Sequence, residues 1–181
     1  MPKNLFLIGP SGCGKSTILR RLLGARMILA GGFLTERSPS GFILRAPSED
    51  CGLPFIRLSP VPQIDEDVFR IDAVRLLQQS LTFPFAIIDE TGGFELEISE
   101  FRSALYELLA SDVPCIGVVK SPENFRAMEQ RISGIHSLHA SALIEFLKQD
   151  SQTQLVPMQG RGDCHVETQV RTWIKEHFHE P

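Results

Sequence analysis

Residues 9–16 read Gly9-Pro10-Ser11-Gly12-Cys13-Gly14-Lys15-Ser16, and this stretch fits the pattern G-x-x-x-x-G-K-[S/T] at every fixed position. The apolar run at 4–8 before it is typical of a buried strand. Residues 18–23 after it place apolar side chains at helical spacing. Glycines let several backbone N–H groups face one anion, and a helix N-terminus adds its positive dipole end. The stretch therefore predicts a phosphate-binding loop between a strand and a helix.

The chemistry of this loop assigns a role to each part of it. Lys15 would reach the β- and γ-phosphates of a nucleoside triphosphate, and the Ser16 hydroxyl would ligate Mg²⁺. A glycine-rich turn with a solvated lysine is the plain alternative, which the flanking strand and helix disfavour. The expected nucleotide-contacting residues are Gly9, Pro10, Ser11, Gly12, Cys13, Gly14, Lys15, Ser16 and Thr17.

Length and composition fit one globular unit. The chain has 181 residues, 43% of them hydrophobic, and a formal net charge of -4, so we expect a single domain over 1–181. A net negative charge argues against a dedicated nucleic-acid surface, and no apolar stretch reaches the length of a membrane span. The four cysteines form no C-x-x-C pair, which favours free thiols in the cytoplasm.

Strand and helix patterns alternate along the chain, which predicts an α/β fold with a mostly parallel sheet flanked by helices. Buried strands are expected at 85–89 and 115–119, and helices at 65–81 and 97–110. Residues 27–29 are expected to be extended. The turn Ser38-Pro39-Ser40-Gly41 lies between apolar segments at 32–35 and 42–44, which predicts a β-hairpin inserted after the first helix.

The strand at 85–89 ends in Asp89, with Glu90 next. Because ligands gather at the carboxyl ends of parallel strands, Asp89 should share an edge with the phosphate loop and hold Mg²⁺ opposite Ser16. Glu90 would be the catalytic base that activates water, with Lys15 as the catalytic cation. An adjacent Asp-Glu pair favours an additional-strand type of hydrolase. Residues 89–92 also fit D-x-x-G, a GTPase switch, but the sequence contains no N-K-x-D motif.

Three segments together resemble the small P-loop nucleoside-triphosphatase family of the thermophile and cancer-related type. They are the phosphate loop, residues 32–36 with 41–42, and residues 88–96, which are similar to the family's I-D-E-I-G-K-M-E-L signature. The resemblance spans roughly Lys3 to Val119. It implies a Mg²⁺-dependent phosphohydrolase with broad base tolerance and slow turnover. This chain departs from the family in having Gly93 where the family has a lysine, and in a shorter hairpin.

Several further residues are candidates for contacting the γ-phosphate. Lys120, just past the strand at 115–119, occupies the place of a phosphate sensor in related ATPases, although strand-end lysines are often simply solvated. The candidates for an arginine finger are Arg37, Arg45, Arg126 and Arg131, each of which also fits a surface role. The histidines His136, His139 and His165 show no metal-ligand spacing, so no zinc site is expected.

These inferences predict a nucleoside triphosphatase that cleaves the β–γ bond of ATP, GTP or other NTPs with the aid of Mg²⁺. Two other functional hypotheses stay open. One is a nucleotide or small-metabolite kinase, although no arginine-rich lid is evident. The other is an NTP-dependent switch or assembly factor whose protein partner stimulates a low basal hydrolysis. The sequence identifies neither that partner nor the preferred base.

Overall fold

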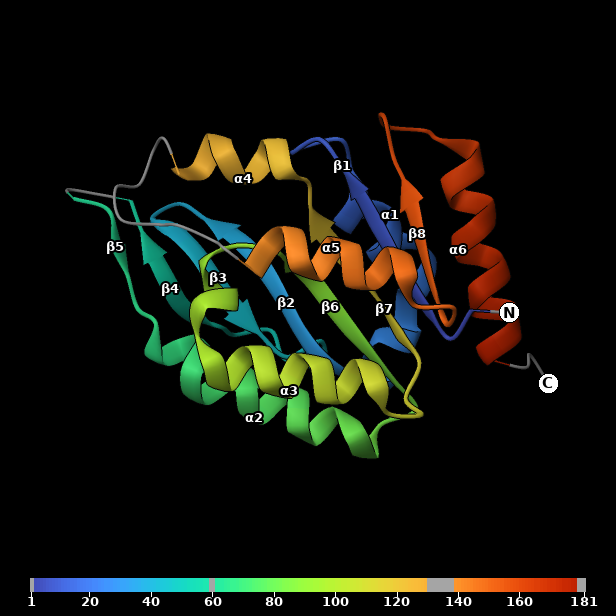
Figure 1. Ribbon diagram of the computed structural model, residues 1–181, viewed down its shortest axis with the longest axis horizontal. Helices are drawn as coiled ribbons and strands as arrows, with labels where there is room; N and C mark the ends of the chain where they lie inside the picture. Colours follow the sequence, from blue (N-terminus) through green and yellow to red (C-terminus); the bar gives the residue numbers. More distant parts are fainter. Residues whose placement is uncertain (1, 59–60, 130–138, 179–181) are drawn as a thin grey trace.

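A computed structural model describes residues 2–58, 61–129 and 139–178. Within them, eight strands form one sheet in the order β5-β4-β3-β2-β6-β7-β1-β8 (Figure 1). The strands are β1 (Asn4–Gly9), β2 (Ala30–Ser38), β3 (Gly41–Arg45), β4 (Leu53–Arg57), β5 (Gln63–Ile64), β6 (Phe85–Thr91), β7 (Cys115–Lys120) and β8 (Thr153–Pro157). The predicted α/β class with a mostly parallel sheet is confirmed, since β2, β6, β7, β1 and β8 are all parallel to their neighbours among these five.

The predicted hairpin is present and forms one end of the sheet. β2 and β3 pair antiparallel, with Ser38 opposite Gly41, and β4 and β5 continue the antiparallel part. Gly41 lies so close to β4 that a Cβ there would meet the Ile56 carbonyl oxygen at 1.8 Å. The short two-residue strand β5 was not predicted.

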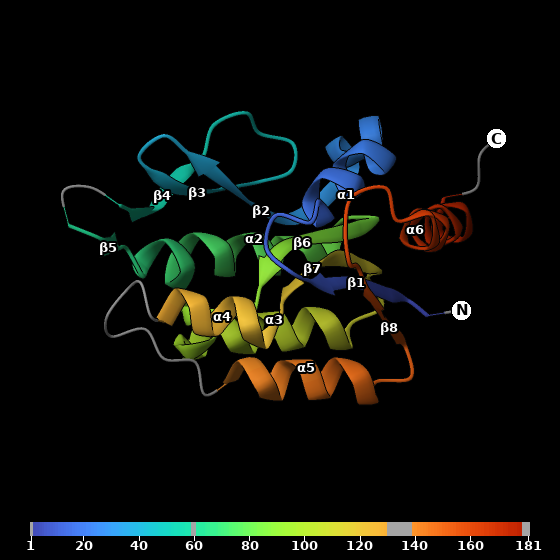
Figure 2. The ribbon, with the colours of Figure 1, turned by 90° about the horizontal axis from the view of Figure 1, so that it is seen from above.

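Helices cover both faces of the parallel strands (Figure 2). They are α1 (Lys15–Leu23), α2 (Val74–Gln79), α3 (Ser99–Ala110), α4 (Pro122–Glu129), α5 (His139–Gln149) and α6 (Cys164–His177), with shorter helical segments η1 (Gly24–Leu29), η2 (Val68–Ala73), η3 (Ser80–Thr82) and η4 (Phe94–Glu97). Helices α1 and α6 lie on one face, and α2, α3, α4 and α5 lie on the other. Each face buries its own apolar core.

The two cores follow from the alternation of side chains along buried strands. In β1, Phe6 belongs to the core beneath α3, whereas Leu5 and Leu7 belong to the core beneath α1 and α6. Trp173 of α6 is also part of the core, and its indole N–H donates to the Lys3 carbonyl at 2.9 Å. Both cores thus hold β1, and with it the start of the phosphate loop, from its two sides.

One local prediction was wrong. Residues 27–29 form the end of the 3₁₀ segment η1, not a strand. The helical prediction for 65–81 has the right type, but two of its apolar residues, Ile71 and Leu81, are 61% and 39% exposed. Ile71 lies in the π-helical turn η2, which shifts the phase of the helix away from 3.6 residues per turn, and Leu81 lies in the separate 3₁₀ segment η3. Phe69 and Ala73 are buried instead.

Candidate functional site: a phosphate loop facing two acidic residues

The loop between β1 and α1 has the backbone shape that its glycines allow. Gly14, the residue before α1, has φ of 101°, a left-handed conformation that side chains rarely adopt. At Gly9, an added Cβ would lie 2.1 Å from the carbonyl oxygen of Met158, so only glycine fits against the end of β8. The loop therefore curls over the first turn of α1, whose N–H groups are available to an anion.

Lys15 is the cation of this loop. Lys15 is only 5% exposed. Its amine donates to the carbonyl oxygens of Gly9 at 2.9 Å and Pro10 at 2.7 Å. These bonds compensate for the burial of the charge. They also hold the amine against the backbone at the start of the loop.

The structure brings Ser16 and Asp89 together across 73 residues of sequence. The Ser16 hydroxyl donates to Asp89 Oδ1 at 2.6 Å. The strand order explains the placement, because β7 lies between β1 and β6 and both strands end at the same edge. This inserted strand is the arrangement expected of the additional-strand type. The paired hydroxyl and carboxylate are hard oxygen ligands, which suit Mg²⁺.

Asp89 is 2% exposed, and this burial raises the pKa of its carboxyl group, whereas the bond from Ser16 and the charge of Arg20 act in the opposite direction. Arg20 Nη2 lies 2.9 Å from Asp89 Oδ2. The guanidinium therefore supplies the positive charge beside this carboxylate in the structure. Sequence analysis missed Arg20, although it lies four residues after Ser16 and so on the same face of α1.

Arg20 is itself part of a chain of charges that reaches into the hairpin. Its Nη1 lies 2.6 Å from Glu36 Oε1, and Arg45 Nη2 lies 2.6 Å from the same oxygen. The Arg45 hydrogen bond, assisted by both positive charges, lowers the pKa of Glu36 despite partial burial. Arg45 also donates to the Ala46 and Glu49 carbonyls, so it is committed to the hairpin. Its guanidinium would have to break these bonds to act as a finger.

Glu90 has an unusual backbone. Its φ is 99°, and within the described residues it is the one position other than glycine with a positive φ. The strain coincides with a register shift between β6 and β7 after Asp89, a bulge that redirects the next side chain. The Glu90 side chain is half-buried and has no hydrogen bond to any residue that the structure describes. Strain of this kind concentrates at functional sites.

This strain predicts a separation of stability from function. Replacing Glu90 by glycine removes the Cβ that disfavours this φ, whereas replacing it by alanine keeps the strain. We expect the E90G variant to have a free energy of unfolding about 1 kcal/mol higher than the E90A variant, measured by denaturant unfolding. An E90A variant equal to or more stable than E90G would mean that the backbone at 90 is not strained.

The turn that follows Glu90 is held by a buried carboxylate. Glu95, 1% exposed, accepts the backbone N–H groups of Gly92 and Gly93, both at 2.8 Å. Gly93, which stands where the resembled family has a lysine, is therefore fixed by its backbone. A Cβ built on Gly92 would lie 3.4 Å from the Cβ of Lys120, and Lys120 pairs with Gly9 in the sheet register. The backbone of Lys120 therefore lies between the phosphate loop and the acidic turn, and its role as a phosphate sensor stays a prediction.

Asn124, on α4, is a contact that sequence analysis missed. Its side-chain amide donates to the Gly9 carbonyl at 2.9 Å, and its oxygen accepts the Ser11 N–H at 2.9 Å. One carboxamide thereby ties both sides of the loop entrance to α4. The start of α4 supports this contact, since the Ser121 hydroxyl accepts the Asn124 N–H. The available signal was a carboxamide in the first turn after a strand that ends at the site.

We expect the N124A variant to bind Mg²⁺ and a non-hydrolysable NTP analogue more weakly by about 5-fold or more, because two hydrogen bonds of about 0.5–1.5 kcal/mol each no longer order the loop. Equilibrium titration measures this. The Q78A variant, which removes an exposed carboxamide of α2, is the matched control. If N124A and Q78A bind the analogue equally well, Asn124 does not position the loop.

The remaining candidates lie apart from this arrangement or beyond the described residues. Arg126 is exposed on α4 and Arg37 is exposed on β2. Arg131 and His136 lie outside the described residues. Within the described part of the chain, no group of three or more His, Cys, Asp or Glu side chains is placed to hold a metal. A Ser–Asp pair completed by phosphate oxygens and water needs no such group.

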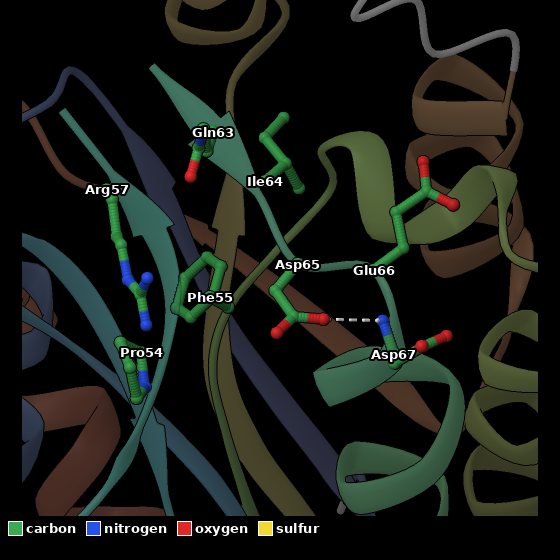
Figure 3. A pocket seen from close by; sticks show the side chains of 8 residues that line it. All are labelled: Pro54, Phe55, Arg57, Gln63, Ile64, Asp65, Glu66 and Asp67. Carbon is green, nitrogen blue, oxygen red and sulfur yellow. Dashed lines mark hydrogen bonds between the residues drawn. The ribbon is translucent and has the colours of Figure 1, made fainter. Parts of the chain in front are cut away.

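A cavity larger than the one beside the phosphate loop lies elsewhere in the described part of the chain. A hollow of about 580 Å³ lies between β4, β5 and the start of η2, lined by Arg57 and by Asp65, Glu66 and Asp67 (Figure 3). Its carboxylates outnumber its cation, which disfavours an anionic ligand. A smaller cavity of about 360 Å³ adjoins Ser16, Arg20 and Glu36. This smaller cavity lies beside the phosphate loop, so we assign the candidate site to it.

The fold and this loop define a P-loop α/β protein, and comparison with known proteins agrees. The model of a family described as NTPase matches residues 60–152, which is about half of the chain, and the protein therefore belongs to this NTPase family. The match includes Asp89, Glu90 and Lys120. The phosphate loop precedes it and is identified by its own motif and geometry.

Among solved structures, the crystal structure of THEP1 from the hyperthermophile Aquifex aeolicus is similar. It has a TM-score of 0.67 and 16% sequence identity over 92% of this chain and 96% of that one. At this identity the similarity supports the fold. No curated protein sequence matches. In the described residues, none of the helices combines the length and apolar character needed to cross a membrane.

Proposed function

We propose that this protein is a Mg²⁺-dependent nucleoside triphosphatase that cleaves the β–γ phosphoanhydride bond with water and tolerates different bases. The observation that carries the proposal is the 2.6 Å bond between Ser16 and Asp89, with Glu90 next in the chain and the phosphate loop at the same edge. The family supports a nucleotide as the substrate. Water as the acceptor rests on Glu90.

Phosphate binding would use the loop and the first turn of α1. Backbone N–H groups of residues 12–17 would donate to the phosphates, assisted by the helix dipole. Lys15 is already inside the loop. Its amine would exchange the neutral carbonyls of Gly9 and Pro10 for the charged β- and γ-phosphate oxygens, which are stronger acceptors.

The acidic side of the site would hold the metal and the water. Ser16 and Asp89 would hold Mg²⁺, Asp89 through a bound water; the bound ion would neutralise charge on the β- and γ-phosphates. Arg20 would then retain its second partner, Glu36. Glu90 would accept a proton from the attacking water while the oxygen of that water bonds to the γ-phosphorus. The bond from phosphorus to the β–γ bridging oxygen breaks, which releases NDP and phosphate.

Other properties of the proposal rest on the whole chain. We place the activity in a single domain over 1–181 that works in the cytoplasm, which the four free cysteines support. The net charge of -4 disfavours a nucleic acid as a partner. A protein partner that stimulates turnover stays an alternative.

Product analysis with ATP, GTP, CTP and UTP tests this function. In the presence of Mg²⁺ we expect NDP and free phosphate in equal amounts from several of the four nucleotides, and neither product when the metal is chelated. NMP with pyrophosphate as the products would place cleavage at the wrong bond. Binding without release of phosphate would favour a switch that needs an activating partner.

A further inference from the structure

A second cavity touches the phosphate loop on the side away from the acidic residues. It has a volume of about 270 Å³ and lies between the first turns of α1, with Thr17 and Ile18, and the segment after β8, with Met158 and Arg161. Whole small-molecule ligands occupy pockets of about 300–1,000 Å³. The size therefore suits one part of a nucleotide, such as a single ring system.

The position of this cavity follows the expected path of a bound nucleotide. In the proposed function, Ser16, Asp89 and Glu90 would face the γ-phosphate end, and the α-phosphate would lie over the N-terminus of α1. Thr17 lines both this cavity and the one that adjoins Arg20 and Glu36. The cavity at Arg20 and Glu36 lies on the side of the acidic residues, where the γ-phosphate would bind. The nucleoside would therefore extend from the α-phosphate in the other direction, toward the cavity at Arg161.

The segment that carries Arg161 is anchored at both ends, so the cavity is preformed. At its start, the buried Met158 donates its N–H to the Ile8 carbonyl at 2.8 Å. At its end, Asp163 caps α6 by accepting the N–H groups of His165 and Val166. Arg161 itself extends over the phosphate loop, where its Cγ would lie 3.4 Å from a Cβ built on Gly14.

The lining has the chemistry of a stacking platform. Ile18 and Met158 supply an apolar floor, and Arg161 supplies a planar cation that stacks on the face of aromatic rings. Within the described part of the chain, the Arg161 guanidinium has no hydrogen bond or ion pair, whereas the other lining arginine, Arg21, pairs with Glu167 at 2.7 Å. No lining side chain is a carboxylate or carboxamide, so the side chains offer little to distinguish one base edge from another.

We propose that this cavity is the nucleobase subsite and that Arg161 binds the base by stacking on its face. The inference rests on the proposed function in taking a nucleoside triphosphate as the ligand. It deepens that function because face stacking accepts every base. Purines, which have the larger ring system, should gain more than pyrimidines.

Equilibrium binding with Mg²⁺ tests the subsite, with the ligands AMP-PNP, GMP-PNP and inorganic triphosphate. We expect the R161A variant to bind both nucleotides about 5- to 30-fold more weakly, because a base–side-chain stack contributes this much or more, and to bind inorganic triphosphate within 2-fold of the intact protein. The R161Y variant, which keeps a stacking face without the charge, should retain most of the nucleotide affinity. The R75A variant, which removes an exposed arginine of α2, controls for net charge.

Several results would overturn the subsite. Equal weakening of triphosphate and nucleotides by R161A would place Arg161 on the phosphates. If R161Y binds nucleotides as weakly as R161A, Arg161 does not act by stacking. If R161A binds nucleotides as well as R75A does, Arg161 does not contact the base. Failure of the intact protein to bind either nucleotide would overturn the subsite as well. The binding measurements do not require turnover. A protein that binds nucleotides but releases no phosphate would therefore contradict the proposed hydrolysis, while the binding measurements would still show whether Arg161 stacks on the base.

Discussion

The E90Q variant should bind Mg²⁺ and NTP with nearly the affinity of the intact protein and lose turnover by about 10²- to 10⁴-fold. Loss of a general base costs about this much. The amide keeps the size of the side chain and the strained backbone but cannot accept the proton of water. Binding is preserved because the phosphate contacts come from the loop and Lys15. Single-turnover phosphate release and equilibrium titration measure the two quantities separately.

The E97Q variant is the matched control, because it makes the same change at an exposed acidic residue seven positions further along the chain. It should hydrolyse NTP normally. If E90Q keeps normal turnover, Glu90 is not the base, and Asp89 or a group outside the described residues would have to activate the water. If E90Q loses binding and turnover together, Glu90 acts on substrate binding.

The K15A variant should show the opposite pattern, with nucleotide affinity as the property that falls. A charge-assisted hydrogen bond contributes about 1.5–3 kcal/mol, so the dissociation constant for AMP-PNP should rise about 10- to 150-fold. Isothermal titration measures it, and thermal unfolding checks that the loop survives without the bonds to Gly9 and Pro10.

A lysine on the surface provides the control for this second change. Lys148 on α5 pairs with Glu145, and the K148A variant should bind AMP-PNP normally. Unchanged nucleotide affinity in K15A would contradict the assignment of residues 9–16 as the phosphate-binding loop. A loss that is equal in K15A and K148A would indicate an effect of net charge alone.

Local pattern was sufficient to predict the parts of the site that depend on local chemistry. The phosphate loop needs glycines and a lysine at fixed spacing, and the strand before Asp89 is a continuous apolar run. Each of these two features can be recognised within about ten consecutive residues. The shared sheet edge then follows from the general rule that parallel strands end together, which is why Ser16 and Asp89 could be paired in advance.

Contacts between distant segments could not be read in this way. Asn124 lies 113 positions from Ser11, and its role depends on where α4 packs. Arg161 reaches Gly14 only because β8 pairs with β1. At η2, a π-helical turn places Ile71 outward, and a prediction from ideal α-helical periodicity does not include such a turn. The strain at Glu90 likewise arises from a bulge against β7.

Hydrolysis in water labelled with ¹⁸O shows whether water is the acceptor, because it reports which oxygen attacks the γ-phosphorus. The intact protein is incubated with Mg²⁺ and ATP, and the products are analysed by mass spectrometry. We expect one ¹⁸O atom from solvent in each released phosphate at the first turnover and none in ADP. Label in ADP, or transfer of the γ-phosphoryl group to an organic acceptor without labelled phosphate, would contradict this expectation.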